Sequence, residues 1–318
     1  MFTSVEICAG AGGQALGLEM AGFEHVRLVE LEAAACQTLK ANRPTWDVRN
    51  GDLRQFSALD LIGVDLVAGG VPCPPFSKAG KQLGKDDERD LFPEAIRLVD
   101  ECRPKAVMLE NVRGLLDSVF DEYRAKIIKD LQKLGYSAEW RLLNASDYGV
   151  SQLRPRVLFV AIRKDLAGHF AWPEALPSQP PTVGELLHDL MAARGWKGAD
   201  EWRERACDIA PTLVGGSKKH GGPDLGPTRA KRAWESLGVD GKGVADLAPD
   251  SDFVGMPRLT VRMTARIQGF PDSWQFSGKK TAAYRQIGNA FPPPVAKAVG
   301  QQIVAALNEA AKPKLKRA

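Results

Sequence analysis

The sequence predicts an α/β fold in which a parallel sheet carries helices on both faces. The first half of the chain alternates short apolar runs with amphipathic stretches, the pattern of repeated strand and helix units. The expected strands are residues 3–8, 26–29, 64–68, 106–109 and 157–162. The expected helices are residues 16–21, 33–41, 92–101 and 123–134.

The character of the chain changes after Phe170. Residues 172–257 are rich in glycine, proline and charged side chains, which predicts a smaller, loop-rich domain. Near the end, apolar residues recur at four-residue spacing after a proline run, which predicts a helix that packs back onto the first domain. They are Val295, Val299, Ile303 and Leu307. We therefore expect a large domain over 1–171, a small domain over 172–272, and a return to the large domain over 273–318.

The composition excludes some classes of protein but does not identify the function. The chain has 318 residues, 44% hydrophobic and 26% charged, with a formal net charge of +4, which permits a polyanionic partner without demanding one. No apolar run reaches the ~18 residues that a membrane span needs. The five cysteines are scattered and form no C-x-x-C pair, so neither a zinc site nor a disulfide scaffold is expected. These features favour a cytoplasmic protein.

A glycine-rich turn follows the first expected strand. Gly10, Gly12 and Gly13 would let the backbone turn sharply and approach a ligand closely. Glu30 ends the second strand, 20 residues after Gly10, where an acidic residue binds ribose hydroxyls in dinucleotide-type folds. Asp52 follows a third candidate strand and could accept a hydrogen bond from an adenine amino group. The pattern indicates an adenosine-containing ligand, although the glycines alone could simply shape a tight turn.

Chemistry-bearing residues follow three later strands. Cys73 lies between prolines on a stiff loop after the fourth strand, which suits an exposed nucleophile better than a buried small hydrophobe. Glu110 ends the next strand, where a carboxylic acid with a raised pKa could hydrogen-bond to a ring nitrogen. Arg154 and Arg156 start the last strand two positions apart, so both are expected to point towards a shared anion or carbonyl.

The ordered motifs resemble those of the DNA cytosine-5 methyltransferase family from about residue 3 to residue 300, with the small domain as an unmatched insert. The nucleophile and acid motifs are Val71-Pro72-Cys73 and Glu110-Asn111-Val112. The arginine motif is Gln152-Leu153-Arg154-Pro155-Arg156. Two later motifs are Arg258-Leu259-Thr260-Val261-Arg262 with Gln268-Gly269-Phe270-Pro271, and Tyr284-Arg285-Gln286-Ile287-Gly288-Asn289-Ala290.

The resemblance implies a fold, a cofactor and a reaction. The fold would be the Rossmann-like mixed sheet of S-adenosylmethionine-dependent methyltransferases, with residues 172–272 as the target-recognition domain. The methyl donor would be S-adenosylmethionine, without a metal, and the acceptor a cytosine flipped out of double-stranded DNA. Cys73 would be the nucleophile, assisted by Glu110, Arg154 and Arg156. The cofactor would contact Cys8, Ala9, Gly10, Gly12, Gly13, Glu30, Leu31, Asp52, Leu91 and Asn289.

DNA contacts are expected mainly in the small domain. A basic cluster within residues 215–232 would hold phosphates, unless it is only a solvated loop. The expected DNA-binding residues are Gln152, Thr212, Lys218, Lys219, Arg229 and Arg258. As in bacterial and phage modification enzymes, we expect a monomer that pairs with a restriction endonuclease or acts alone.

The sequence departs from the family pattern at several positions. Cys8 replaces the usual phenylalanine, Leu31 a large aromatic residue, Pro74 a glutamine and Met263 a glutamate. Three alternative functions explain less of the sequence. A transfer-RNA cytosine methyltransferase would carry a Cys-Phe-Thr tripeptide, which this sequence lacks. A catalytically silent DNA-binding regulator would not need the catalytic cysteine, glutamate and arginine positions to be filled. A nicotinamide dehydrogenase would use only the glycine turn and leave the later motifs unexplained.

Overall fold

The computed structural model describes residues 1–72, 90–215 and 223–311. Its centre is a seven-stranded sheet with the order β3-β2-β1-β4-β5-β7-β6. The strands are β1 (Phe2–Ile7), β2 (Phe23–Glu30), β3 (Val48–Asn50), β4 (Leu66–Gly70), β5 (Ala106–Val112), β6 (Tyr136–Asn144) and β7 (Pro155–Arg163). The predicted α/β fold is confirmed.

The sheet is mixed rather than wholly parallel. The pairs β2–β3, β1–β2, β1–β4 and β4–β5 are parallel, whereas β7 runs antiparallel to both β5 and β6. The expectation of a parallel sheet was therefore wrong at this edge, and β6 was not predicted. The mixed sheet that the family resemblance implied is the one observed.

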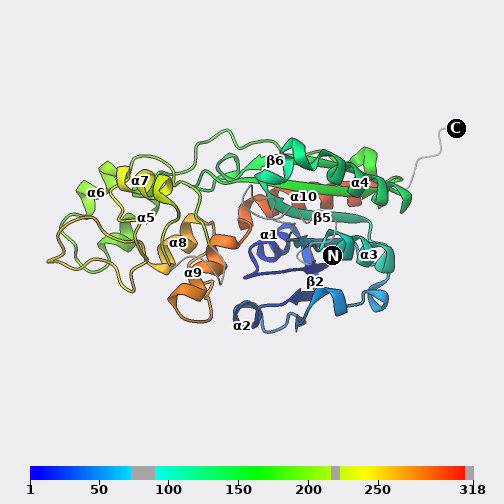
Figure 1. The fold of residues 1–318 in the computed structure, drawn as a ribbon, viewed down its shortest axis with the longest axis horizontal. Helices are drawn as coiled ribbons and strands as arrows, with labels where there is room; N and C mark the ends of the chain where they lie inside the picture. The colour runs from blue at the N-terminus through cyan, green and yellow to red at the C-terminus, as the bar shows by residue number, and fades with distance from the viewer. Residues whose placement is uncertain (73–89, 216–222, 312–318) are drawn as a thin grey trace.

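Helices cover both faces of the sheet (Figure 1). On one face, α3 (Phe92–Cys102) and α4 (Asp121–Lys133) bury apolar residues against the strands. On the other, α1 (Gly13–Ala21) packs beside α10 (Pro293–Ala311), whose apolar stripe includes Val295, Val299, Ile303 and Leu307. This confirms that the last helix packs back onto the first domain. The remaining sheet helix, α2 (Ala33–Asn42), lies beside β3.

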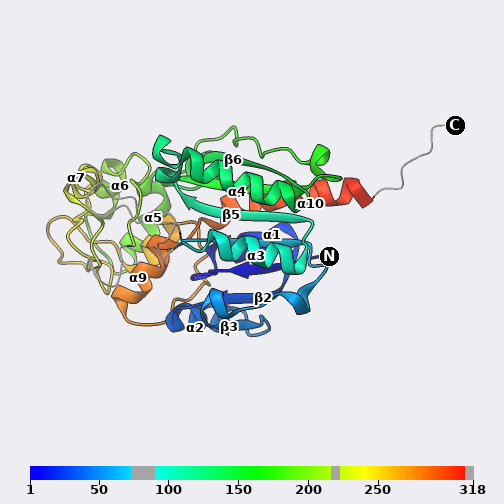
Figure 2. The same ribbon diagram turned by 45° about the vertical axis from the view of Figure 1, so that its right-hand side comes forward.

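The chain from α5 to α9 forms a second lobe beside the sheet, which Figure 1 and the turned view of Figure 2 both show. Its helices are α5 (Val183–Ala192), α6 (Ala199–Arg205), α7 (Thr228–Ser236), α8 (Val261–Ile267) and α9 (Lys280–Asn289). One apolar cluster runs from Trp202 and Trp234 in this lobe to Leu39 of α2. The two parts therefore share a core, and the domain boundaries given above remain a prediction. No helix in the described ranges is long and apolar enough to cross a membrane.

Candidate active site

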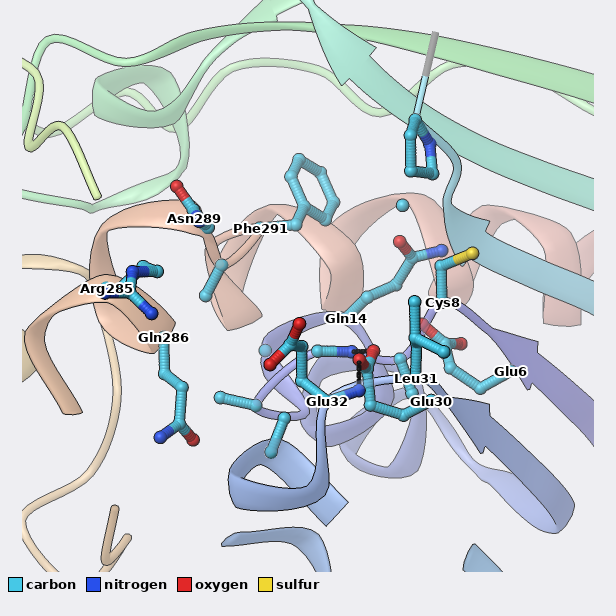
Figure 3. A pocket seen from close by; sticks show the side chains of 18 of the residues that line it. Glu6, Cys8, Gln14, Glu30, Leu31, Glu32, Arg285, Gln286, Asn289 and Phe291 are labelled. Atoms are coloured by element: carbon cyan, nitrogen blue, oxygen red, sulfur yellow. Dashed lines mark hydrogen bonds between the residues drawn. The ribbon is translucent and has the colours of Figure 1, made fainter. Parts of the chain in front are cut away.

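A cavity of about 490 Å³ lies at the carboxyl ends of β1, β2 and β4, and we call it the main cavity because most of the predicted cofactor residues line it. Parallel strands present their loops and carboxyl ends at this edge, where open α/β sheets bind ligands. The opposite wall comes from α9 and from Ala290 and Phe291, which lead into α10, far away in the sequence (Figure 3). The predicted cofactor residues that line it are Cys8, Ala9, Gly10, Gly13, Glu30, Leu31, Leu91 and Asn289.

The glycine turn has a backbone shape that explains its composition. Gly12 has φ +86°, in the left-handed region that favours glycine. A Cβ on Gly13 would stand 2.2 Å from the carbonyl oxygen of Phe291, so only glycine lets α1 approach the start of α10 this closely. The glycines thus shape one end of the cavity and join its two walls. The turn begins at Cys8, which itself has φ +51°.

Glu30 lies at the wall of the cavity, held by backbone amides. The N–H groups of Gly10 and Glu32 each donate to its carboxylate at 2.7 Å. Burial raises the pKa of Glu30, and the two backbone hydrogen bonds oppose that shift by stabilising the charged form. This geometry fixes an acceptor beside the glycine turn. The neighbouring Leu31 is 62% exposed, so an apolar surface flanks the carboxylate.

A second cavity of about 230 Å³ adjoins the first around Asp52. The two share Cys8, Leu31, Pro72 and Leu91 in their linings. Arg54 pairs with the Asp52 carboxylate at 2.6 Å and lowers the pKa of that carboxyl group through hydrogen bonds. Asp52 therefore stays an anionic acceptor at the far end of a two-part site, although Arg54 already engages it.

Glu110 and Arg156 form an ion pair at the inner end of the main cavity. The Arg156 Nε lies 2.8 Å from a Glu110 carboxylate oxygen, and the two side chains are only 12% and 11% exposed. Burial raises the pKa of Glu110, while the charge of Arg156 opposes the rise. A carboxyl group with a raised pKa holds a proton more readily than a solvent-exposed carboxyl group does.

The loop that leads to Cys73 starts beside this pair. Gly70 of β4 is in register with Glu110 of β5, and Asn111 donates its side-chain N–H to the carbonyl of Val71 at 2.7 Å. The N–H of Leu91 donates to the carbonyl of Pro72 at 3.2 Å, so these two residues are neighbours at the cavity. Cys73 itself and Pro74 lie outside the described residues.

Arg154 and Gln152 occupy positions that differ from the prediction. Arg154 is 0% exposed and donates to the carbonyls of Leu213, Gly288 and Ala290 at 2.8, 2.7 and 3.0 Å. Arg154 therefore does not share a target with Arg156, because it precedes β7 and turns into the core. Gln152 is equally buried and bonds to Gln268 and to the N–H of Leu213, which leaves it no surface for a DNA contact. Both residues join the second lobe to the cavity wall.

The other expected DNA-binding residues lie on the second lobe or outside the described structure. Arg229 is exposed on α7, and Arg258 is half-exposed and paired with Asp240 at 2.8 Å. Thr212 bonds through its hydroxyl to the carbonyl of Leu153. Lys218 and Lys219 lie outside the described residues.

Sequence reasoning assigned no site role to five polar residues that line the main cavity: Glu6, Gln14, Glu32, Arg285 and Gln286. Glu6 could have been noticed, because a lone carboxylate inside the apolar strand run Val5-Glu6-Ile7 is unusual in a fully buried strand. Gln14 and Arg285 carry no such signal. In the described ranges, no grouping of histidine, cysteine, aspartate and glutamate could hold a metal ion.

Comparison with known proteins identifies relatives of the whole chain. Residues 2–305 match the family described as C-5 cytosine-specific DNA methylase. The chain is 63% identical to the Type II methyltransferase M.NgoMIV of Neisseria gonorrhoeae, covering 97% of this chain and 99% of that protein. It is 60% identical to the Type II methyltransferase M.NaeI of Lentzea aerocolonigenes, covering 96% and 75%.

Solved structures share the fold at low identity. DNMT2 of Spodoptera frugiperda superposes with a TM-score of 0.68 at 19% identity, covering 96% of this chain and 100% of that chain. A prophage-encoded E. coli protein described as a DNA modification methyltransferase gives 0.69 at 23%, covering 97% and 100%. These likenesses support the fold alone, whereas the sequence matches establish the family. The chain belongs to the C-5 cytosine-specific DNA methylase family and is a DNA (cytosine-5) methyltransferase.

Proposed function

We propose that this protein transfers a methyl group from S-adenosylmethionine to C5 of a flipped-out cytosine in a specific duplex DNA sequence, through a covalent bond between Cys73 and C6. One observation carries the proposal. The cavity that begins at the glycine turn and Glu30 ends at the buried Glu110, which Arg156 holds. A site suited to adenosine and a site suited to acid–base chemistry therefore share one cavity.

The residues present suit the proposed cofactor. Glu30 would accept the ribose hydroxyls and Asp52 the adenine amino group, since the two linked cavities place these carboxylates at successive positions. Leu31 and Leu91 provide apolar surface between them. S-adenosylmethionine supplies an electrophilic methyl group on a sulfonium when bound. Cys8, in place of an aromatic residue, would offer the adenine less stacking surface.

The chain's own groups would activate the cytosine. The thiolate of Cys73 adds to C6, which breaks the aromaticity of the ring and makes C5 nucleophilic. Glu110 would hydrogen-bond N3 and Arg156 would hold O2, so that charge developing on the ring is stabilised. After methylation a base, which could be water, removes the C5 proton and the Cys73–C6 bond breaks. The register of Gly70 with Glu110 supports this arrangement, because it starts the Cys73 loop beside the acid.

The DNA would be bound by the second lobe. Extruding a cytosine costs a few kcal/mol of stacking and pairing, so phosphate and base contacts must compensate for it. Arg229 and Arg258, together with Lys218 and Lys219, would supply phosphate contacts, which position the duplex without specifying its sequence. The Type II names of the relatives support a function beside a restriction endonuclease, and we propose a monomer acting in the cytoplasm.

The test uses the purified protein with tritium-labelled methyl donor and mixed-sequence duplex DNA, with transfer RNA as the alternative acceptor. Label in DNA as 5-methylcytosine, abolished by Cys73→Ser, supports the proposal, and bisulfite sequencing then gives the target site. Label in transfer RNA alone would overturn the substrate. Cofactor and DNA binding without any label would favour a silent DNA-binding regulator.

A further inference from the structure

Two tyrosine hydroxyl groups bond to the segments that lead into and out of α3. Before the helix, the Tyr123 hydroxyl donates to the Asp90 carboxylate at 2.6 Å. After the helix, the Tyr136 hydroxyl donates to the carbonyl of Pro104 at 2.6 Å. The first bond lies beside the main cavity, which Leu91 lines, whereas Pro104 lies just before the amino end of β5. The two bonds are alike in length but differ in what they can affect.

Asp90 links the Tyr123 hydroxyl to the first turn of α3. The same carboxylate oxygen also accepts from the N–H of Phe92, the first residue of the helix, at 3.1 Å. The N–H groups at a helix start favour a carboxylate there. Tyr123 lies on α4, which packs beside α3 (Figure 2), and its ring meets that of Phe92 edge to face with centroids 6.0 Å apart. Packing therefore holds the ring that carries the hydroxyl, which makes it a fixed donor for Asp90.

Leu91, between Asp90 and Phe92, connects this anchor to the reaction site. Leu91 lines both cavities, and so does Pro72. The N–H of Leu91 donates to the carbonyl of Pro72, which is the residue before Cys73 in the sequence. A shift of Asp90 must therefore move Leu91, and with it the hydrogen bond to Pro72. A continuous series of contacts thus runs from α4 to the residue that precedes the proposed nucleophile.

Resting on the proposed function, we propose that Tyr123 is a positioning residue for methyl transfer. Through Asp90 it fixes the Leu91–Pro72 hydrogen bond, and so the point from which the chain continues to Cys73. A nucleophile that is held imprecisely slows the reaction more than it weakens binding, because reaction requires closer alignment than binding does. Tyr123 should therefore affect kcat more than KM.

The test removes single hydroxyl groups. Tyr123→Phe keeps the ring that packs on Phe92 and loses only its donor. Tyr136→Phe is the matched control, because it loses a hydroxyl bond of the same length beside the other end of α3. Asp90→Ala removes the acceptor and tests the same bond from its other partner. Each enzyme would be assayed with tritium-labelled methyl donor and duplex DNA for its single-turnover rate, kcat and KM, and urea unfolding would measure its stability.

The rate should fall only where the bond beside the cavity is lost. In Tyr123→Phe the single-turnover rate falls about fivefold to fiftyfold, within the range of a hydrogen bond to a charged group, while KM for the methyl donor changes less than about threefold. Tyr136→Phe keeps the wild-type rate although it loses stability. Asp90→Ala is at least as slow as Tyr123→Phe, and combining the two substitutions lowers the rate no further.

Two results would overturn the assignment. One is a folded Tyr123→Phe enzyme with the wild-type rate. The other is an equal loss of rate in Tyr136→Phe, which would mean that both hydroxyl groups only stabilise the fold. If Tyr123→Phe does not fold, an Asp90→Ala enzyme with the wild-type rate refutes the proposal by itself. A Cys73→Ser enzyme that retains full methyl transfer would instead refute the proposed function, since the nucleophile would then lie elsewhere.

Discussion

Replacing Glu110 by glutamine should separate the chemical role of this residue from its structural one. Glutamine keeps the shape of the side chain and an oxygen that can accept from Arg156, but it removes the charge and the titratable proton. We expect methyl transfer to fall by about 10²- to 10⁴-fold, the usual contribution of a positioned acid or base. The affinity for S-adenosylhomocysteine should change little, because Glu110 faces the base side of the cavity.

The expected loss of stability in Glu110→Gln follows from the burial of the Glu110–Arg156 ion pair. Removing one partner of a buried ion pair costs about 3–5 kcal/mol, since the other charge is left unpaired. Glu110→Gln should cost less, about 1–3 kcal/mol, because the hydrogen bond at 2.8 Å can survive and burial already raises the pKa of Glu110. Urea unfolding followed by circular dichroism would measure the difference.

A matched variant controls for the loss of a buried charge alone. Asp65→Asn breaks the Asp65–Lys105 pair, whose atoms are 2.6 Å apart at the opposite edge of the sheet. This variant should lose some stability and retain full methyl transfer under single-turnover conditions. A folded Glu110→Gln enzyme with the wild-type rate would refute the assignment of Glu110 to the chemistry.

Three further changes test other parts of the structure. Burial raises the pKa of Glu6 above the ordinary carboxyl value of about 4.5, so the folded state binds more protons than the unfolded state and stability is lost as pH rises above that value. The Glu6→Gln variant should therefore lose less stability than wild type between pH 5 and pH 8, as measured by urea titrations. Identical pH profiles for the two proteins would contradict this account of Glu6. Arg154→Met leaves buried carbonyls without donors and should cost at least about 3 kcal/mol in the same assay; a cost below about 1 kcal/mol would contradict this role. Arg229→Ala should weaken DNA binding and reduce the salt slope by about one without changing stability, and an unchanged slope would remove Arg229 from the interface.

The central strands were predictable because they are buried on both faces and read as apolar runs. The edge strand β6 was not, since its residues alternate between buried and exposed and include Glu139 and Arg141. Nothing local to residues 157–162 indicates that β7 runs antiparallel. Strand direction depends on where the preceding segment crosses the sheet, and sequence spacing does not fix that.

The sequence likewise predicted some residues of the candidate site correctly and others wrongly. The glycine turn, Glu30 and Glu110 were found because each lies near the carboxyl end of a strand, at the ligand-binding edge. Arg154 was misjudged because its direction depends on carbonyls of residues 213, 288 and 290, which no local pattern reveals. Its partners become neighbours only when the second lobe packs against the sheet. The roles of Cys73 and of the DNA-contacting residues remain predictions.

The two-sided construction of the main cavity has a consequence for protein synthesis. One wall includes residues of β1 and α1, and the other comes from α9 and the segment that joins it to α10. Nascent chains fold from the amino terminus, so the ribosome releases the glycine turn long before the segment that encloses it. A partly synthesised chain therefore exposes Gly13 and Glu6 to water and cannot retain the methyl donor. The enzyme cannot modify DNA until α9 and α10 have been translated and have folded back over the turn.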